Sequence, residues 1–447
     1  MKYKIILIYF LLFVKLGISQ NGKISPENAL SGYMQNGDKT YAWEIKDSIS
    51  SGKTKLYQLL LNSQQWHGIT WRHQLTILVP GNVMYQNALL FITGGSNKDG
   101  QPNWAKTDGL WSPLAEMAEK NKAIVAILRQ VPNQPLFNDL VEDALISHTL
   151  HQYKKDGDHS WPLLFPMVKS AVRAMDAVQE FSAQKLFISI KDFTITGASK
   201  RGWTTWLSAA IDDPRVKAIA PMVIDMLNMP ATLNYQFQTY GEYSSEIEDY
   251  VKLGIPQAAS SPEGQKINTM IDPYSYRGKL KIPKILFIGT NDPYWTVDAT
   301  KHYWDEIPGQ NMIHYVPNAG HNLGGGKQAL ETLSAFWGLG NSDQTFPVCN
   351  WKVSDTDKGV QMIVSALPND LMEVTLWETT SADKDFRNNL WLSKRLKYDD
   401  ASQIKIIKPY PKNGHQAFYI DLKYKAPNGG TYSVCSRIYV SDHNKLW

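Results

Sequence analysis

The sequence of 447 residues lacks the features that mark several protein classes. Its two cysteines allow at most one intramolecular disulfide. Its 46 basic and 42 acidic residues leave no large positive excess for binding nucleic acid. Past the N-terminal segment, no apolar stretch approaches the length of a membrane span, so we expect no stable membrane insertion. With 43% hydrophobic and 20% charged residues, the chain is typical of a globular protein, and its length predicts two domains.

The N-terminal segment has the pattern of a secretory signal peptide. Basic residues precede an apolar run over 5–14, and Gly17-Ile18-Ser19 supplies the small residues of a cleavage site. We therefore predict a signal peptide over residues 1–19 and an exported protein, periplasmic or secreted. Its three lysines account for three of the four formal positive charges, which leaves a mature chain near +1 (4 − 3) with no electrostatic case for nucleic acid.

A glycine-flanked serine follows a short β-type run and precedes a helical pattern. The run covers 193–196, the motif Gly-Ala-Ser-Lys-Arg-Gly covers 197–202, and the helical pattern begins at Trp203. A tight strand-to-helix turn of this kind, a nucleophile elbow, aims the serine hydroxyl at substrate. We therefore predict Ser199 as a nucleophile. The alternative is a serine that caps the helix through its first backbone N–H groups.

An acid and a histidine follow later β-type runs in the order that an elbow predicts. Asp292 comes after a buried run that begins at Lys284, and His321 lies in a loop after a run that begins at Met312. The order Ser, Asp, His is that of α/β-hydrolases. A hydroxyl needs a base to accept its proton, and an imidazole needs a carboxylate to hold its tautomer. We predict His321 as the base and Asp292 as the acid, with Asp225 as the alternative acid.

Two backbone N–H groups are expected to form an oxyanion hole. One belongs to Lys200, the residue after the nucleophile, and the other to the loop after an earlier strand. The run 88–93 leads into Gly94 and Gly95, where the missing side chains let the backbone approach a substrate closely. The Lys200 ammonium either adds positive charge near the oxyanion or is a solvated surface group.

The middle of the chain alternates β-type and helical patterns. From Ala88 onward this alternation predicts a mostly parallel sheet flanked by helices. Earlier β-type runs suggest an antiparallel edge to that sheet, at 41–45, 54–62 and 70–80. With the motif order, the pattern predicts an α/β-hydrolase domain over residues 20–342. A long irregular segment at about 226–280 is predicted to form a lid over the site, with a surface excursion as the alternative.

The C-terminal part has a different texture. Short β-type runs occupy 360–367, 372–377, 417–424 and 432–440. Their spacing predicts a small β-sandwich over residues 343–447. In an exported protein, a disulfide between Cys349 and Cys435 would join its first and last strands. Two unpaired buried thiols are the alternative.

Two histidines three residues apart raise the question of a metal. His148 and His151 follow closely after Glu142 and Asp143. This spacing lacks the motif context of zinc sites, so the segment is interpreted as a solvated helix and no metal is predicted.

Three motifs together resemble the PhoPQ-activated pathogenicity-related protein family. They are Gly-Ala-Ser-Lys-Arg-Gly-Trp at 197–203, Gly-Thr-Asn-Asp-Pro-Tyr-Trp at 289–295 and Pro-Asn-Ala-Gly-His at 317–321. An N-terminal pattern adds to the resemblance, at Ala29, Leu30, Tyr33, Tyr41, Ala42 and Trp43. The resemblance implies an α/β-hydrolase-like fold and export in bacteria, in a family that also takes in a slime-mould autocrine proliferation repressor. Arg201 departs from the general elbow, which has a glycine two residues after the serine.

The sequence therefore predicts an exported serine hydrolase. Ser199, His321 and Asp292 would cleave an ester or amide bond in a small molecule, a peptide or a glycan ester, with no cofactor. The alternative is a secreted signalling or binding protein on a hydrolase scaffold, with catalysis dispensable or absent.

Overall fold

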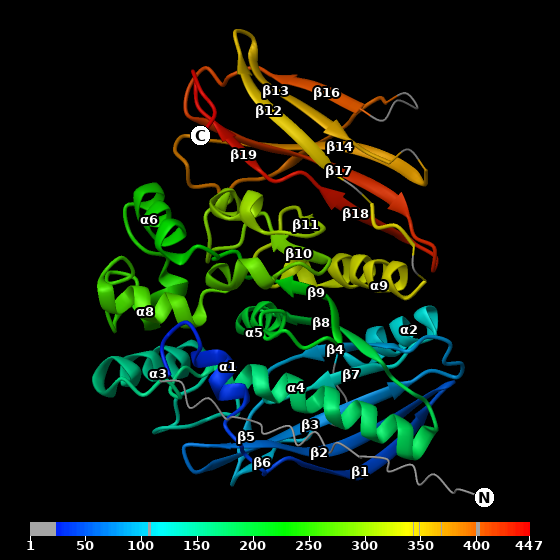
Figure 1. Cartoon of the computed structure of the whole chain (residues 1–447). Coiled ribbons are helices and arrows are strands. Elements are labelled where there is room, and N and C mark those ends of the chain that lie inside the picture. Colours follow the sequence, from blue (N-terminus) through cyan, green and yellow to red (C-terminus); the bar gives the residue numbers. More distant parts are fainter. Residues whose placement is uncertain (1–23, 106–108, 343, 348, 368, 399–402) are drawn as a thin grey trace, which may run out of the picture.

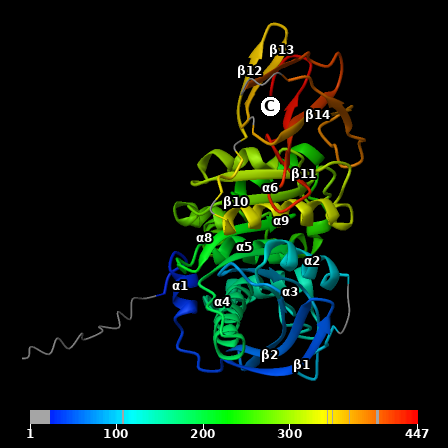
Figure 2. The same ribbon diagram turned by 90° about the vertical axis from the view of Figure 1, so that its right-hand side faces the viewer.

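A computed structural model describes residues 24–105, 109–342, 344–347, 349–367, 369–398 and 403–447. The predicted signal peptide, residues 1–19, lies outside them. Figure 1 shows one large sheet flanked by helices and two smaller sheets at one end of the molecule. In Figure 2, the small sheets and strands β1 and β2 lie at opposite ends.

The large sheet has nine strands in the order β1-β2-β3-β7-β4-β8-β9-β10-β11. Their bounds are β1 Ala42–Ser51, β2 Thr54–Trp66, β3 Ile69–Val79, β7 Val125–Leu128, β4 Asn87–Ile92, β8 Asp192–Ala198, β9 Val216–Met222, β10 Lys284–Gly289 and β11 Asn311–Val316. Pairing is antiparallel from β1 to β7 and parallel from β7 to β11. The predicted antiparallel edge and mostly parallel sheet are confirmed.

Helices cover both faces of this sheet because its central strands are apolar on both sides. Leu90 and Ile92 of β4 belong to a core shared with α4 (Leu164–Phe181) and α5 (Lys200–Ser208). The alternate residues of β4 belong to a second core, shared with α2 (Trp111–Asn121) and α9 (Lys327–Asn341). Side chains of successive strand residues point to opposite faces, which explains the division. Of the described helices, none combines the length and apolar character needed to span a membrane.

The segment at about 226–280 is mostly helical, so its prediction as irregular was wrong. It contains α6 (Met229–Tyr240), α7 (Glu248–Val251) and α8 (Pro262–Ile271). Two 3₁₀ turns complete it, at Ser245–Ile247 and Pro273–Lys279. The hydroxyl of Ser261 accepts a hydrogen bond from the Gly264 N–H and so begins α8. An earlier excursion from the sheet contains α3 (Glu142–Asp156), and α1 (Ala29–Met34) precedes β1.

The C-terminal part forms two antiparallel sheets. One has the order β12-β13-β16, and the other has the order β15-β14-β17-β18 with β19 paired to β17. Their bounds are β12 Asn350–Thr356, β13 Gly359–Ser365, β16 Gln403–Lys408, β15 Leu392–Arg395, β14 Leu371–Ser381, β17 His415–Lys425, β18 Thr431–Cys435 and β19 Tyr439–Ser441. Buried residues of both sheets, such as Met362 and Ile420, share one core. The run expected at 432–440 is two strands, and β15 and β16 were not predicted.

The predicted disulfide is a further correction, because Cys349 and Cys435 are both free. Cys349 precedes β12 instead of lying within it, and Cys435 ends β18 instead of lying in the last strand. Cys435 belongs to one core, whereas Cys349 packs against the other. Burial raises the pKa of each thiol, so both stay protonated.

Candidate active site

Ser199 lies in a strained turn between β8 and α5. Its backbone has φ 59° and ψ −127°, a left-handed conformation that a residue with a side chain rarely adopts. Close packing leaves no room for side chains at the flanking glycines: a Cβ at Gly197 would lie 2.8 Å from the Arg201 Cβ, and one at Gly202 would lie 2.7 Å from the Met222 carbonyl oxygen. The Ser199 side chain makes no capping hydrogen bond to α5, which argues against the helix-cap alternative.

His321 and Asp292 are brought together from the loops after β11 and β10. The His321 Nδ1 lies 2.9 and 3.1 Å from the two carboxylate oxygens of Asp292. The backbone N–H of Tyr294 donates to the same carboxylate at 3.0 Å. The Tyr294 ring also stacks on the imidazole, with centroids 4.1 Å apart. These contacts fix the orientation of His321, and the carboxylate favours the tautomer with a proton on Nδ1.

Asp225 has a different partner. Its carboxylate accepts a 2.6 Å hydrogen bond from the Tyr303 hydroxyl. Burial raises the pKa of Asp225 to about 8, and the nearby negative charge of Asp292 adds to this rise. Asp292 is therefore the carboxylate that binds His321, and the alternative acid Asp225 is held elsewhere.

The second imidazole nitrogen of His321 is buried and has no hydrogen-bond partner among the described residues. Among the hydrogen bonds of the described residues, none joins His321 to Ser199. Such bonds are often long in unliganded hydrolases and tighten when substrate binds. The unpartnered Nε2 is the atom that a serine hydroxyl or a leaving group would meet.

The glycines predicted for the oxyanion hole lie beside the elbow. Strands β4 and β8 are parallel neighbours, and Ile92 pairs with Gly197. Two residues further along each strand direction come Gly94 and Ser199, so the two loops leave the same sheet edge. Gly94 also packs on Arg201, because a Cβ there would lie 2.5 Å from the guanidinium.

Arg201, which departs from the usual elbow, makes an ion pair that the sequence did not reveal. Its guanidinium donates to both oxygens of the Glu142 carboxylate, at 2.6 and 2.7 Å. The Lys200 ammonium lies 2.9 Å from Glu142 and 3.1 Å from Asp143. Burial alone would raise the pKa of Glu142, but the two cations outweigh it and lower that pKa to about 2. Lys200 is therefore paired, neither solvated nor a free positive charge at the oxyanion.

Three of the four residues considered as metal ligands serve other contacts. Glu142 and Asp143 bind the two cations, and His148 contacts Gln152 and the ring of Phe137. Among the described residues, no group of three or more His, Cys, Asp or Glu side chains is placed to hold a metal ion. The sequence shows two adjacent cations, Lys200 and Arg201, and two adjacent acids, Glu142 and Asp143. These two pairs were the signal that could have indicated the ion pairs.

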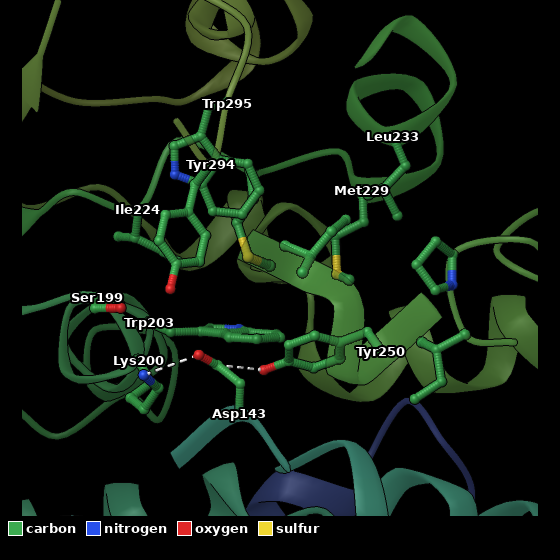
Figure 3. A pocket seen from close by; sticks show the side chains of 14 residues that line it. Asp143, Ser199, Lys200, Trp203, Ile224, Met229, Leu233, Tyr250, Tyr294 and Trp295 are labelled. Carbon is green, nitrogen blue, oxygen red and sulfur yellow. Dashed lines mark hydrogen bonds and ion pairs between the residues drawn. The ribbon is translucent and has the colours of Figure 1, made fainter. Parts of the chain in front are cut away.

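A small cavity, partly open to solvent, lies in front of Ser199. Figure 3 shows Ser199 and Lys200 on one side and α6 on the other, with the Tyr294 hydroxyl directed toward the side of Ser199. The loops after the strands and α5 contribute apolar side chains to the cavity lining: Trp203, Ile224, Met226, Tyr294 and Trp295. The helical segment contributes Met229, Leu233, Ile247, Tyr250, Ile255 and Pro256. The segment predicted as a lid therefore forms a wall of the cavity.

The C-terminal part contacts the two loops that hold the acid and the base, which sequence reasoning did not anticipate. The amide of Asn291 donates to the backbone carbonyls of Arg387 and Asn389, at 3.1 and 2.8 Å. The amide of Asn318 exchanges two hydrogen bonds with the backbone of Trp391, at 2.7 and 3.0 Å. Asn291 directly precedes Asp292, so residues 387–391 of the C-terminal part support the loops that carry the acid and the base.

Comparison with known proteins identifies the family and the fold of this chain. The sequence profile described as PhoPQ-activated pathogenicity-related protein matches residues 30–387. Autocrine proliferation repressor protein A of Dictyostelium discoideum is 30% identical over 429 residues, which cover 88% of this chain and 85% of that protein. Acetyl xylan esterase 1 from a Thermoanaerobacterium species matches with a TM-score of 0.50 at 16% identity, over 71% of this chain and 96% of the esterase. A Paenibacillus acetyl xylan esterase matches with a TM-score of 0.48 at 10% identity, over 69% of this chain and 92% of that esterase. The fold is that of the α/β-hydrolases.

Proposed function

The chain belongs to the PhoPQ-activated pathogenicity-related protein family, and on that premise we propose that it is a serine esterase. Ser199 attacks the carbonyl carbon of a carboxylic ester. His321 accepts the serine proton at Nε2 and returns it to the departing alcohol, while Asp292 orients the imidazole through Nδ1. Water then hydrolyses the acyl-enzyme by the same route. An α/β-hydrolase scaffold shared with esterases supports the choice of reaction class.

The observation that carries the proposal is the pairing of His321 with Asp292. The carboxylate occupies Nδ1, and Nε2 is left buried without a partner in the described part of the chain. With Nδ1 held by the carboxylate, Nε2 is the nitrogen free to accept a proton from Ser199. Backbone N–H groups of Lys200 and of Gly94 or Gly95 complete the proposal as the oxyanion hole.

Export is part of the proposal. The pattern of residues 1–19 supports a secreted or periplasmic enzyme, and its substrate would then be met outside the cytoplasm. The cavity favours a small-molecule ester or the ester group of a glycan over a polypeptide chain, because its apolar lining offers few partners for amide groups.

Turnover of p-nitrophenyl butyrate by the purified protein tests the proposal. We expect Asp292→Asn to lower kcat by about 10³-fold to 10⁴-fold, because the imidazole loses its orienting carboxylate. Asp225→Asn is the matched control, and we expect its kcat to stay within about threefold of wild type. Equal losses in the two variants, or turnover that survives Ser199→Ala, would contradict the assignment.

A second candidate function is supported by the relative from Dictyostelium discoideum, whose name describes an autocrine proliferation repressor. On this alternative the protein is a secreted signal on a hydrolase scaffold. A Ser199→Ala variant that folds normally would then keep full repressor activity on proliferating cells. An esterase whose product carries the signal would lose it.

A further inference from the structure

We propose that the cavity in front of Ser199 binds an uncharged, apolar group of the substrate, aromatic or branched, on one side of the scissile ester. This inference rests on the proposed esterase function and names the class of ester. It excludes acetate esters of sugars, free carboxylates and charged peptides as preferred substrates.

The shape and chemistry of the walls carry the first step. Aromatic surfaces from Trp203, Tyr250 and Tyr294 meet aliphatic side chains such as Leu233 across the cavity. Apolar surface that faces a small aqueous cavity is stabilised when an apolar ligand displaces the water. Flat aromatic side chains also provide faces for stacking or edge contacts with a ligand ring. The cavity therefore selects for apolar carbon skeletons.

The charges at the cavity are already paired, which is the second step. The Lys200 ammonium is bound by Glu142 and by Asp143. The other oxygen of Asp143 accepts a 2.9 Å hydrogen bond from the Tyr250 hydroxyl. No charge among the lining residues is left to neutralise a charged ligand, and placing an unpaired charge against apolar walls is costly. A carboxylate or ammonium on this part of the substrate is therefore disfavoured.

The walls are held in place by hydrogen bonds, which is the third step. The Trp203 indole N–H donates to the Ile271 carbonyl oxygen at 2.6 Å and so ties α5 to α8. The Tyr250 hydroxyl is fixed by Asp143. A cavity with walls held in this way is preformed for its ligand.

The test compares kcat/KM across two ester series with the full mature chain. One series varies the acyl group of p-nitrophenyl esters: acetate, butyrate, hexanoate and benzoate. The other varies the alcohol of acetate esters: methyl, benzyl and naphthyl. We expect kcat/KM to rise about threefold for each methylene that enters the cavity, and by more for a ring, in one series. A butyrate analogue ending in a carboxylate, the p-nitrophenyl hemisuccinate, is expected to react at least tenfold more slowly.

Leu233→Trp fills the cavity and locates the effect. We expect it to reduce kcat/KM for the preferred large ester at least tenfold, and by more than it reduces kcat/KM for methyl acetate. Asn234→Trp is the matched control, because Asn234 is exposed on the same helix, and it should leave both rates unchanged. If p-nitrophenyl acetate is the best substrate of the acyl series and methyl acetate is the best substrate of the alcohol series, or if both Trp variants behave alike, the inference is wrong. Absence of turnover on every ester would instead overturn the esterase proposal itself.

Discussion

Asp225 and Asp292 are both buried but have different hydrogen-bond partners. Asp225 and Asp292 follow neighbouring strands, and both are almost completely buried. Their loop contexts predicted Asp292 as the partner of the histidine, and it is Asp292 that binds His321. The hydroxyl that holds Asp225 belongs to Tyr303, and no local pattern in the sequence signals that contact. The sequence context therefore distinguishes the two acids, whereas the hydrogen-bond partner of Asp225 depends on the fold.

The raised pKa of Asp225 predicts a pH dependence of stability. Because the folded-state pKa is about 8 and an unfolded aspartate titrates near 4, the folded state binds the extra proton between these values. The contribution of Asp225 to the free energy of unfolding therefore falls as pH rises from about 4 to 8. Asp225→Asn keeps an acceptor for Tyr303 and has no charge to bury.

Chemical denaturation at pH 5 and pH 8 measures this effect. We expect the wild-type protein to lose more stability between the two pH values than Asp225→Asn does. Lys55→Gln, at an exposed position on β2, controls for the removal of a single surface charge. An identical pH dependence in wild type and Asp225→Asn would show that Asp225 is already ionised in the folded protein.

At the scale of elements, the strands of the central sheet and the helices that flank it followed from the sequence. The side-chain contacts that join α5 to α3 and to α8 did not. Alternating apolar residues and the elbow motif are local signals. Polar and aromatic residues are mixed through α6, so its periodicity was too weak to predict a helix at 229–240. Arg201 stands where the general elbow has a glycine, and its guanidinium extends to Glu142 and links α5 to α3. Such a contact joins distant residues and leaves no periodic trace.

The pair between Arg201 and Glu142 is expected to stabilise the fold measurably. Arg201 is about nine-tenths buried and Glu142 is about one-third exposed, at side-chain exposures of 10% and 36%. Removing one member of a buried pair leaves its partner uncompensated, although Lys200 still faces Glu142. We expect Arg201→Ala to lower the free energy of unfolding by about 2 kcal/mol.

Urea denaturation of two alanine variants tests this expectation. Lys279 pairs with Asp212 at 2.6 Å on the surface, so Lys279→Ala should cost at most about 0.5 kcal/mol. Similar losses in the two variants would mean that the Arg201 pair is no stronger than a surface contact.

At the scale of the whole molecule, the C-terminal sheets are joined to the site. Their existence followed from short β-type runs, but their contact with the acid and base loops did not, because it uses backbone carbonyls of residues 387–391. Every residue has a backbone carbonyl, so the residue types at 387–391 do not indicate that they accept these hydrogen bonds. The C-terminal part is therefore a support for the loops of Asp292 and His321 as well as a separate pair of sheets.

Asn291→Ala is expected to affect catalysis through this support. The amide bonds of Asn291 to Arg387 and Asn389 are lost, and the neighbouring Asp292 is held less precisely. We expect kcat on p-nitrophenyl butyrate to fall about tenfold with KM within about twofold. Asn389→Ala is the control, since its amide bonds only to Thr380 within the C-terminal part. A change in KM alone, or no change, would exclude a positioning role.

Covalent labelling shows whether Ser199 is an activated nucleophile, on which the proposed esterase activity depends. The purified mature protein is treated with a fluorophosphonate, and the modified residue is located by mass spectrometry of its peptides. We predict one adduct, on Ser199, that disappears in Ser199→Ala and is strongly reduced in His321→Ala. A folded wild-type protein that takes up no label, or takes it up on another residue, would contradict the assignment of Ser199 as the nucleophile.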